Sequence, residues 1–412
     1  MNKPKIIITF SYYGIGGAQR RAINLANEFV NNGYRVEILA VLGKDGSIKY
    51  GENHFNLDES IDLVLIPDYY SLNKNTTVVE QMAKKYIRKI KMLKRIQLLL
   101  KSFKKINNCI NDNIRGIRNS TDLRVYLVAN QGAIIISFGF NIFEKVYWAA
   151  KGLNFKIIYA ETNASDKFIN DRNFNATCRL LKKANSWVFQ TKEQRRFLGY
   201  ENNPDAEVIH NPIKECLSDV YIGTKQKTIV NFCRLSPQKN LILLVKAFEK
   251  FLRQNPEYVL KIYSDTVSKS ELYLKDELLL YINEHNLKDK VFILPPRSDI
   301  HDVIKDCAMF VSSSDYEGIS NSMIEAMAMG LPCVCTDCRG GGAREMITDG
   351  ENGLLVPVGD VEALSQAMHR MVNEEGLAEK CGKNAALVRE TLSIEKITQQ
   401  WLDVIEEING KR

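Results

Sequence analysis

A strand–loop–helix–strand rhythm at the start of the sequence limits what this chain can fold into. Residues 5–10 are an apolar run, residues 18–31 carry apolar side chains at helical spacing, and residues 35–41 form a second apolar run. Two short strands joined by a helix make a βαβ unit, and such units build parallel sheets. The first half of the chain therefore predicts a doubly wound α/β domain.

The same rhythm begins again after a polar stretch. Further strands of the first series are expected at residues 61–66, 133–138, 156–160 and 186–189. Asn211-Pro-Ile ends that series, and residues 214–227 have the composition of a linker. The second series predicts strands at 228–232, 259–263, 291–294, 309–312 and 332–336, alternating with helices at 241–253, 271–286, 299–307 and 321–329. Amphipathic helices at 361–373 and 394–408 follow.

The length agrees with two domains, because 412 residues are too many for one hydrophobic core. We expect domains at residues 1–213 and 214–393 with a cleft between them, and residues 394–412 as a helix that packs back toward the first domain. A composition of 45% hydrophobic and 25% charged residues excludes wholesale disorder, collagen and coiled coil. No apolar run approaches the roughly 20 residues of a membrane-spanning helix.

The cellular setting is predicted from the N-terminus and the cysteines. Met1 to Lys5 lead straight into the first strand, which is not the pattern of a signal peptide. Nine cysteines spread over this length are not a disulfide framework. We therefore expect a cytoplasmic protein.

The positive charge is concentrated in residues 81–118. This segment holds twelve Lys and Arg against one Asp, a formal charge of +11, so the rest of the chain sums to −4 within a total of +7. Its apolar residues recur at spacings of three and four, as in an amphipathic helix. Three interpretations stay open: a solvated face packed on its own domain, contact with an anionic membrane or acceptor, and nucleic acid. No nucleic-acid motif accompanies the segment, so we expect no nucleic-acid partner.

The sequence from Ser312 to Pro332 is the most informative stretch. A strand ends near Ser312, and a helix begins near Asn321, with Ser320 or Asn321 as its N-cap. The free N–H groups of such a helix start form an anion site suited to a diphosphate. Glu317 and Glu325 flank it, and carboxylates there suit the hydroxyl groups of a ribose or a sugar ring. A loop acid and a favourable first-turn charge are the alternative interpretation.

Two other loops follow predicted strands. Arg234 and Lys239, in Arg-Leu-Ser-Pro-Gln-Lys, lie where parallel sheets bind ligands, and both side chains suit phosphate. Each could equally be a surface charge. The loop Gly14-Ile-Gly16-Gly17-Ala-Gln-Arg20 lacks the full dinucleotide spacing, but its backbone can approach a ligand of the opposite domain closely.

Together these motifs resemble glycosyltransferase family 4, the retaining enzymes of the GT-B fold, over nearly the whole chain. The most specific are the Glu317–Glu325 pair, Arg234-Leu-Ser-Pro-Gln-Lys-Asn, Asn211-Pro-Ile, and Asp349-Gly-Glu-Asn-Gly-Leu-Leu-Val-Pro. The resemblance implies two Rossmann-like domains, an N-terminal one for the acceptor and a C-terminal one for a nucleotide sugar. It also implies that Glu317 contacts the donor sugar, that Glu325 contacts the ribose, and that Arg234 and Lys239 hold the diphosphate.

The resemblance assigns further residues to the site. Glu161 corresponds to a position facing the donor sugar, and Gly16 and Gly17 to a loop beside the diphosphate and acceptor. It implies additional substrate contacts from Gly318, Ile319, Ser320, Asn321, Pro295 and Arg297. Two departures concern the loops after strands 259–263 and 291–294, which read Ser264-Asp-Thr and Leu294-Pro-Pro-Arg where glycines are usual. The turn Arg339-Gly-Gly-Gly is unusually rich in glycine.

The chemistry implied is transfer of a sugar from a nucleotide sugar, with UDP favoured, to a saccharide acceptor. Positive side chains and a helix N-terminus can stabilise the departing diphosphate, so we expect no metal or other cofactor. Cys333, Cys335 and Cys338 have no second pair or nearby His to complete a zinc site. The basic segment favours a lipid-linked acceptor at the inner face of the plasma membrane, in cell-surface polysaccharide synthesis. The alternatives are a nucleotide-sugar epimerase of the same fold and a non-catalytic sugar-nucleotide-binding protein.

Overall fold

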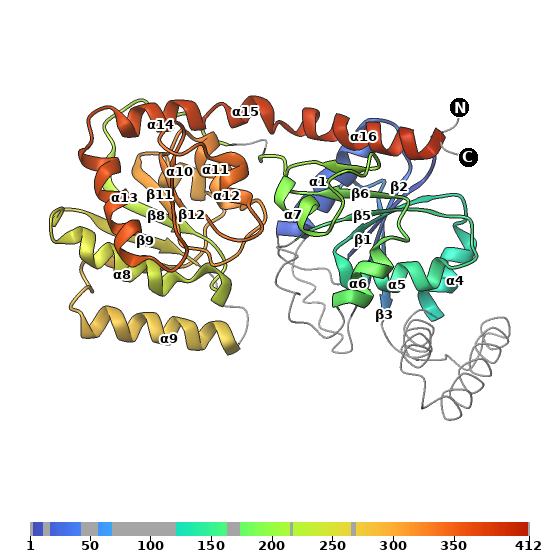
Figure 1. The fold of residues 1–412 in the computed structure, drawn as a ribbon, viewed down its shortest axis with the longest axis horizontal. Coiled ribbons are helices and arrows are strands. Elements are labelled where there is room, and N and C mark those ends of the chain that lie inside the picture. Colours follow the sequence, from blue (N-terminus) through green and yellow to red (C-terminus); the bar gives the residue numbers. More distant parts are fainter. Residues whose placement is uncertain are drawn as a thin grey trace.

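The computed structural model describes residues 3–10, 17–42, 57–67, 121–162, 174–214, 217–264 and 269–410. Within these ranges the strands form two sheets, one in each half of the chain, and every strand pairing is parallel. Figure 1 shows the two sheets and their helices side by side as two domains. The predicted α/β architecture with two parallel-sheet domains is confirmed.

The first domain contains a seven-stranded sheet in the order β3-β2-β1-β4-β5-β6-β7. Its strands are β1 (Ile6–Phe10), β2 (Val36–Leu42), β3 (Asp62–Pro67), β4 (Ile134–Phe138), β5 (Lys156–Ala160), β6 (Ser186–Phe189) and β7 (Ala206–Val208). Its helices include α1 (Gly17–Asn31), α4 (Thr121–Ala129), α5 (Phe140–Ala150), α6 (Phe174–Leu181) and α7 (Lys192–Phe197). The three-residue β7 is too short to give a sequence signal, and it was not predicted.

The second domain contains a six-stranded sheet in the order β10-β9-β8-β11-β12-β13. Its strands are β8 (Gln226–Phe232), β9 (Val259–Tyr263), β10 (Val291–Leu294), β11 (Cys307–Ser312), β12 (Cys333–Thr336) and β13 (Leu354–Val356). Its helices include α8 (Leu241–Leu252), α9 (Lys269–Glu284), α10 (Ile300–Ile304), α11 (Asn321–Ala328), α12 (Gly342–Met346), α13 (Val361–Asn373), α14 (Leu377–Ala385) and α15 (Val388–Thr391), and a 3₁₀ turn covers Pro237–Lys239.

Strand β1 illustrates why the sequence forms these sheets. All five of its residues are buried, and it pairs with β2 on one side and with β4 on the other. A strand covered on both faces has no polar face, so it reads as a continuous apolar run and not as an alternation. The expected strands at 156–160, 186–189, 259–263 and 291–294 agree residue for residue with the structure.

The helix predicted at 299–307 is too long. Helix α10 ends at Ile304, and Cys307 is already the first residue of β11. The Cys307 side chain is buried, and its backbone is in register with Gln226 of β8. A short helix followed at once by a buried strand gives one continuous apolar pattern, which the periodicity alone divides at the wrong residue.

The chain crosses between the domains twice, and the two crossings lie together. The predicted boundary at 213–214 falls between β7 and β8, and the Ile213 N–H donates to the carbonyl of Leu392, 2.9 Å away. After Leu392, α16 (Ile394–Gly410) runs along the first domain, where it packs against α1 (Figure 1). Trp401 of α16 is fully buried, with its ring 6.0 Å from that of Phe138.

Two of the predictions concern a membrane. In the part of the chain that the structure describes, no helix is long and apolar enough to span a bilayer. The basic segment 81–118 lies outside the described residues.

Candidate active site

The order of the strands reverses at the centre of the second sheet, between β8 and β11. Ligands of open parallel sheets bind at such a switch point, outside the carboxyl ends of the strands. The Arg234–Lys239 loop follows β8, and the Ser313–Glu317 loop follows β11. The topology therefore brings the two motifs to the same edge, although Lys239 and Glu317 are 78 residues apart in the sequence.

Hydrogen bonds join the two loops into one unit. The Asp315 N–H donates to the carbonyl of Gln238 at 2.9 Å, and the Asn240 amide donates to the Asp315 carboxylate at 2.8 Å. The Ser313 hydroxyl donates to the carbonyl of Lys239 at 2.9 Å. Asn240 has a left-handed backbone (φ 43°) and caps α8 by accepting from the Leu243 N–H. The loop after β8 is therefore held from both sides.

Glu317 and Lys239 form an ion pair inside this unit. The Lys239 ammonium lies 2.5 Å from Glu317 Oε2, and the Gln238 amide donates to the same oxygen at 2.9 Å. Their side chains are only 16% and 21% exposed. Burial disfavours the charge on Lys239, but Glu317 outweighs this effect and raises the pKa of Lys239 above its ordinary value. Glu317 is therefore neutralised locally, and it need not repel an anion.

Cys233 and Arg234, the two residues that directly follow β8, lie near this ion pair. Arg234 is exposed at the carboxyl edge of the sheet. Burial raises the pKa of the neighbouring Cys233 thiol to about 11, and the positive charges of Lys239 and Arg234 offset this rise only in part. The thiol is thus neutral near pH 7 and is poorly suited to act as a nucleophile.

The loop before α11 lies at the junction of the two domains. Gly318, Ile319 and Ser320 are buried, and Asn321 is half-buried. Ser320 is the N-cap of α11, but its side chain does not cap the first turn, so the turn's N–H groups are not satisfied by it. This is the arrangement that the sequence predicted for an anion site.

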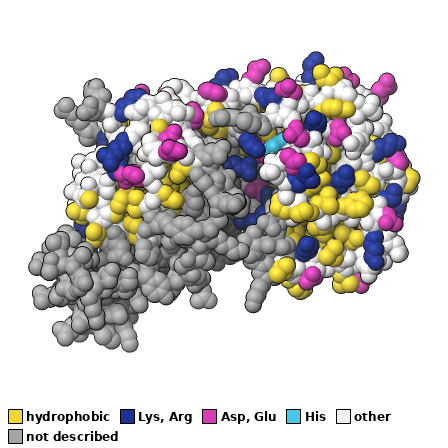
Figure 2. All heavy atoms as spheres, turned by 180° about the vertical axis from the view of Figure 1, so that it is seen from behind, with side chains coloured by type: hydrophobic (Ala, Val, Ile, Leu, Met, Phe, Trp, Pro, Cys, Tyr) yellow, Lys and Arg dark blue, Asp and Glu magenta, His cyan; other side chains and the backbone are white. Residues whose placement is uncertain are grey.

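The first domain contacts this loop through two buried amides. The Ile319 N–H donates to the Gln190 side-chain oxygen at 3.1 Å. The Asn211 amide donates to the carbonyl of Ile319 at 3.2 Å and to the side-chain oxygen of Asn321 at 3.0 Å. Figure 2 shows Lys and Arg side chains in the hollow where the two domains meet.

Glu325 is held from both domains. Its Oε1 lies 2.7 Å from the guanidinium of Arg20 on α1, and its Oε2 lies 2.9 Å from Nε2 of His301 on α10. The side chains of Glu325 and His301 are each 7% exposed, whereas that of Arg20 is 43% exposed. Both candidate carboxylates are thus paired with a basic side chain.

The glycine-rich turn at 339–342 packs directly against the loop before α11. The Glu317 N–H donates to the carbonyl of Arg339 at 2.8 Å, and a Cβ on Gly342 would lie 1.8 Å from the carbonyl oxygen of Gly318. Only glycine permits this approach. The first domain reaches the same turn, because the Thr191 hydroxyl donates to the carbonyl of Gly340 at 2.7 Å.

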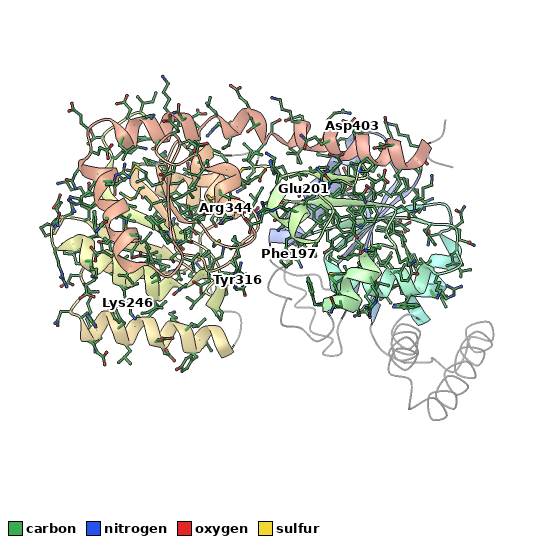
Figure 3. The ribbon with its side chains drawn as sticks, in the orientation of Figure 1. Phe197, Glu201, Lys246, Tyr316, Arg344 and Asp403 are labelled. Atoms are coloured by element: carbon green, nitrogen blue, oxygen red, sulfur yellow. The ribbon has the colours of Figure 1, made fainter. Side chains whose placement is uncertain are left out.

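An ion pair between the domains lies next to this turn. Arg344 of α12 is 2.6 Å from Glu193 of α7 and 2.5 Å from Asp337. Figure 3 shows Arg344 on the side of the second domain that faces the first. Segment 190–193 therefore contacts the second domain at the Gly318–Ile319 loop, the glycine turn and α12.

Three predicted site residues are not among the residues that make these contacts. Glu161 directly follows β5 in the first domain, where the Tyr159 hydroxyl donates to its carboxylate at 2.6 Å. Pro295 is exposed after β10. Arg297 is also exposed and forms a two-pronged ion pair with Asp299 at 2.8 and 2.7 Å. Gly17 is the first residue of α1, and Gly16 lies outside the described residues.

The structure adds residues to which the sequence analysis assigned no role. Gln190 directly follows β6, so the rule that ligand sites lie at the carboxyl ends of parallel strands could have found it. His301 gave no signal, because its partner Glu325 lies 24 residues away on a different helix. His210 contacts the carbonyl of Gln190 at 2.9 Å, at the edge of its domain.

The cysteines of β12 give no sign of a metal site. Cys333 and Cys335 are buried on this strand, and burial raises the pKa of Cys335 to about 12. Across the described ranges, no group of three or more His, Cys, Asp or Glu side chains is arranged to hold a metal ion.

Comparison with known sequences finds a family match in the second domain. Residues 217–388 match the family model described as "Glycosyl transferases group 1". An N-acetylgalactosamine-N,N'-diacetylbacillosaminyl-diphospho-undecaprenol 4-alpha-N-acetylgalactosaminyltransferase of Campylobacter jejuni is 35% identical over 44% of this chain and 48% of its own length. A poly(ribitol-phosphate) alpha-N-acetylglucosaminyltransferase of Staphylococcus aureus is 28% identical over 54% of this chain and 44% of its own. The chain thus matches about half the length of these relatives.

Comparison with solved structures covers both domains. A TarM variant of S. aureus in complex with fondaparinux, alpha-GlcNAc-glycerol and UDP has a TM-score of 0.71 at 16% identity, over 98% of this chain and 99% of that one. Anabaena HepE in complex with UDP has a TM-score of 0.72 at 17% identity, over 98% of this chain and 100% of that one. At these identities the likeness concerns the fold.

Proposed function

We propose that this GT-B chain is a glycosyltransferase, because residues 217–388 match the glycosyl transferases group 1 family. We further propose that it is retaining, as the resemblance of its motifs to family 4 implies. Its donor is a nucleotide sugar, UDP-linked, and its acceptor is a lipid-linked saccharide used for a bacterial surface polysaccharide. Two kinds of similarity support these details. Structures of the same fold bind UDP, and the C. jejuni relative is named for an undecaprenol-linked acceptor.

One observation carries the proposal: the loops after β8 and β11 meet at the switch point of the second sheet. They combine the exposed Arg234, the Lys239–Glu317 ion pair and the start of α11. Two cations and a helix N-terminus are suited to a diphosphate, while paired carboxylates can still accept hydrogen bonds from sugar hydroxyls.

The reaction follows from where charge develops. The bond from the anomeric carbon to the diphosphate oxygen breaks, and the carbon forms a bond to the acceptor oxygen on the same face. The acceptor proton passes to the departing diphosphate. Arg234, Lys239 and the first turn of α11 stabilise the negative charge that builds up on the leaving group. Glu317 lies beside this charge and accepts hydrogen bonds from the donor sugar, and Glu161 faces the sugar from the first domain.

Product analysis tests this function against its rivals. The protein is incubated with UDP-sugars and a lipid-linked acceptor, and both substrates are followed by mass spectrometry and proton NMR. We expect a longer acceptor whose new linkage keeps the donor's anomeric configuration. A changed donor without transfer would identify an epimerase, and unchanged donor and acceptor would favour a binding protein.

Chelation tests the source of the positive charge. If Arg234, Lys239 and α11 stabilise the diphosphate, no divalent metal is needed, and EDTA leaves the transfer rate unchanged. Loss of transfer in EDTA, restored by Mg²⁺ or Mn²⁺, would show that a metal supplies this charge instead.

Attachment to a membrane is a separate part of the proposal. Its basis is the +11 charge of residues 81–118, which favours a peripheral position on the cytoplasmic face of the plasma membrane. Replacing these Lys and Arg residues by Gln should release the protein from anionic vesicles while UDP binding persists. Unchanged vesicle binding would contradict this assignment.

A further inference from the structure

Glu325 is buried, yet its carboxylate oxygens have acceptor positions beyond those that its two partners use. Each carboxylate oxygen has two acceptor positions, and Arg20 and His301 each use one of them. In the proposed function the remaining positions accept the ribose hydroxyls of the nucleotide. How well they do so depends on how firmly the carboxylate is oriented before the nucleotide arrives.

His301 is built to orient this carboxylate. Nε2 lies 2.9 Å from Glu325 Oε2, and because a carboxylate can only accept, this nitrogen carries the hydrogen. The imidazole is fixed in turn, since its ring packs edge-on against Phe232 at 6.3 Å and 86°. Ile300 and Ile304, on either side of it in α10, are buried in the core.

The two partners of Glu325 differ in how rigidly they can act. Arg20 is 43% exposed and belongs to the other domain, so its contact changes whenever the domains move relative to one another. His301 belongs to the same domain as Glu325 and is 7% exposed, so it stays beside the carboxylate. Its helix also follows the Pro295–Arg297 loop, which the sequence analysis predicted to contact the donor.

We propose that His301 is a positioning residue of the nucleotide site: it holds Glu325 in the orientation that recognises the ribose diol. The inference rests on the proposed function of Glu325. It predicts that His301 contributes to UDP binding only through the ribose hydroxyls, and not through the base or the diphosphate.

The test compares two ligands in three variants. UDP and 2′,3′-dideoxy-UDP, which lacks the diol, are titrated by calorimetry into the wild type, His301→Leu and His301→Gln. In the wild type, loss of the bonds to a charged acceptor should weaken binding about tenfold or more. In His301→Leu this ratio should fall to within about twofold of unity, because UDP loses affinity and the dideoxy ligand does not. His301→Gln keeps an N–H donor and should retain most of the ratio.

The matched control is a second His–Glu pair of the same domain. His285 lies 3.0 Å from Glu249, between α9 and α8, and neither residue belongs to the candidate site. His285→Leu should leave both the affinities and their ratio unchanged. A His301→Leu protein that binds UDP and keeps the wild-type ratio of the two affinities would overturn the role of His301. It would leave the proposed function intact.

A wild type that binds no UDP, or binds both ligands equally, would overturn the ribose role of Glu325 and the inference with it. Should His301→Leu not fold, the wild type alone decides. The imidazole nitrogen signals of His301 should then shift in NMR spectra on addition of UDP but not of the dideoxy ligand. Equal shifts with both ligands would contradict the proposal.

Discussion

At the scale of single residues, the two candidate carboxylates of the second domain, Glu317 and Glu325, are each paired with a basic side chain. Lys239 neutralises Glu317, and Arg20 and His301 both contact Glu325. Unpaired carboxylates beside a diphosphate site would repel the ligand, whereas paired ones can accept hydrogen bonds without a large repulsion. The pairing explains how acidic side chains can lie next to a site for an anion.

Loss of Lys239 tests the role of its charge. Lys239→Ala should lower kcat by about a hundredfold or more, because the leaving group loses one of its cations and Glu317 loses its partner. The measurement is the transfer rate at saturating UDP-sugar. Lys250→Ala, which removes an exposed ion pair between Lys250 of α8 and Glu362 of α13, is the control and should have a normal rate. A near-normal rate for Lys239→Ala would contradict the assignment of Lys239 to the diphosphate site.

The raised pKa of Lys239 predicts that this lysine adds no pH dependence to UDP binding below about pH 9. Burial opposes the charge and Glu317 outweighs it, so the proton stays bound at pH values below the ordinary lysine pKa and is lost only above it. Between about pH 6 and 9 the UDP affinity of the wild type should therefore change in parallel with that of Lys239→Arg, whose charge is permanent. Calorimetric titration over this pH range measures the ratio of the two UDP affinities. A wild type that loses affinity relative to Lys239→Arg toward pH 9 would contradict the expectation.

At the scale of elements, the site is a stack of loops at one sheet edge. Hydrogen bonds join the loop after β8 to the loop after β11, and the turn at 339–342 contacts the loop after β11. Segment 190–193 of the first domain contacts two of these layers. The position of the Gly318–Ile319 backbone is therefore set by its neighbours on both sides.

Gly342 tests this arrangement. In Gly342→Ala the new Cβ would lie 1.8 Å from the Gly318 carbonyl oxygen, so the loop must shift. Donor contacts depend on positions within about an ångström, and we expect KM for the UDP-sugar to rise about tenfold or more. Steady-state kinetics measure this. Gly410→Ala, where a Cβ meets nothing within 4 Å, is the matched control. Unchanged kinetics in Gly342→Ala would show that the loop tolerates displacement.

The sequence predicts which loops lie at this sheet edge, but it does not predict which side chains contact one another there. Buried strands are continuous apolar runs, so the alternation places Arg234, Lys239 and Glu317 after strands of one parallel sheet. That these two strands are neighbours is known only from the sheet topology. The partners of Glu325 are different, because His301 and Arg20 lie 24 and 305 residues away. No local pattern reports such a contact. The glycines at 340–342 were visible as unusual, but the structure is needed to explain them: Gly340 and Gly341 have positive φ, and Gly342 lies against the Gly318 carbonyl.

At the scale of the whole molecule, α16 ties the end of the chain to the first domain. Trp401 is fully buried against Phe138, and the guanidinium of Arg21 lies 5.4 Å from the Trp401 ring and 5.5 Å from the Phe138 ring. The chain passes from the second domain to this helix beside the Ile213–Leu392 hydrogen bond. The core of the first domain is therefore completed by residues at the far end of the sequence.

Removing this ring should weaken the first domain. Trp401→Ala should lower its free energy of unfolding by about 3–5 kcal/mol, as for other large buried aromatic residues. Urea unfolding followed by circular dichroism measures the change. Leu387→Ala, at a side chain that is 58% exposed, should change stability by less than about 0.5 kcal/mol. A loss below about 1 kcal/mol in Trp401→Ala would mean that α16 contributes little to this core.

The measurement that tests the central claim most directly is thermal unfolding with UDP, GDP, ADP and CMP, for the wild type and Glu325→Ala. A ligand at 100 times its dissociation constant adds about 2.7 kcal/mol of stability. We expect UDP to stabilise the wild type and not Glu325→Ala. If no nucleotide stabilises the wild type, or if UDP stabilises both proteins equally, the second domain does not bind the nucleotide as described.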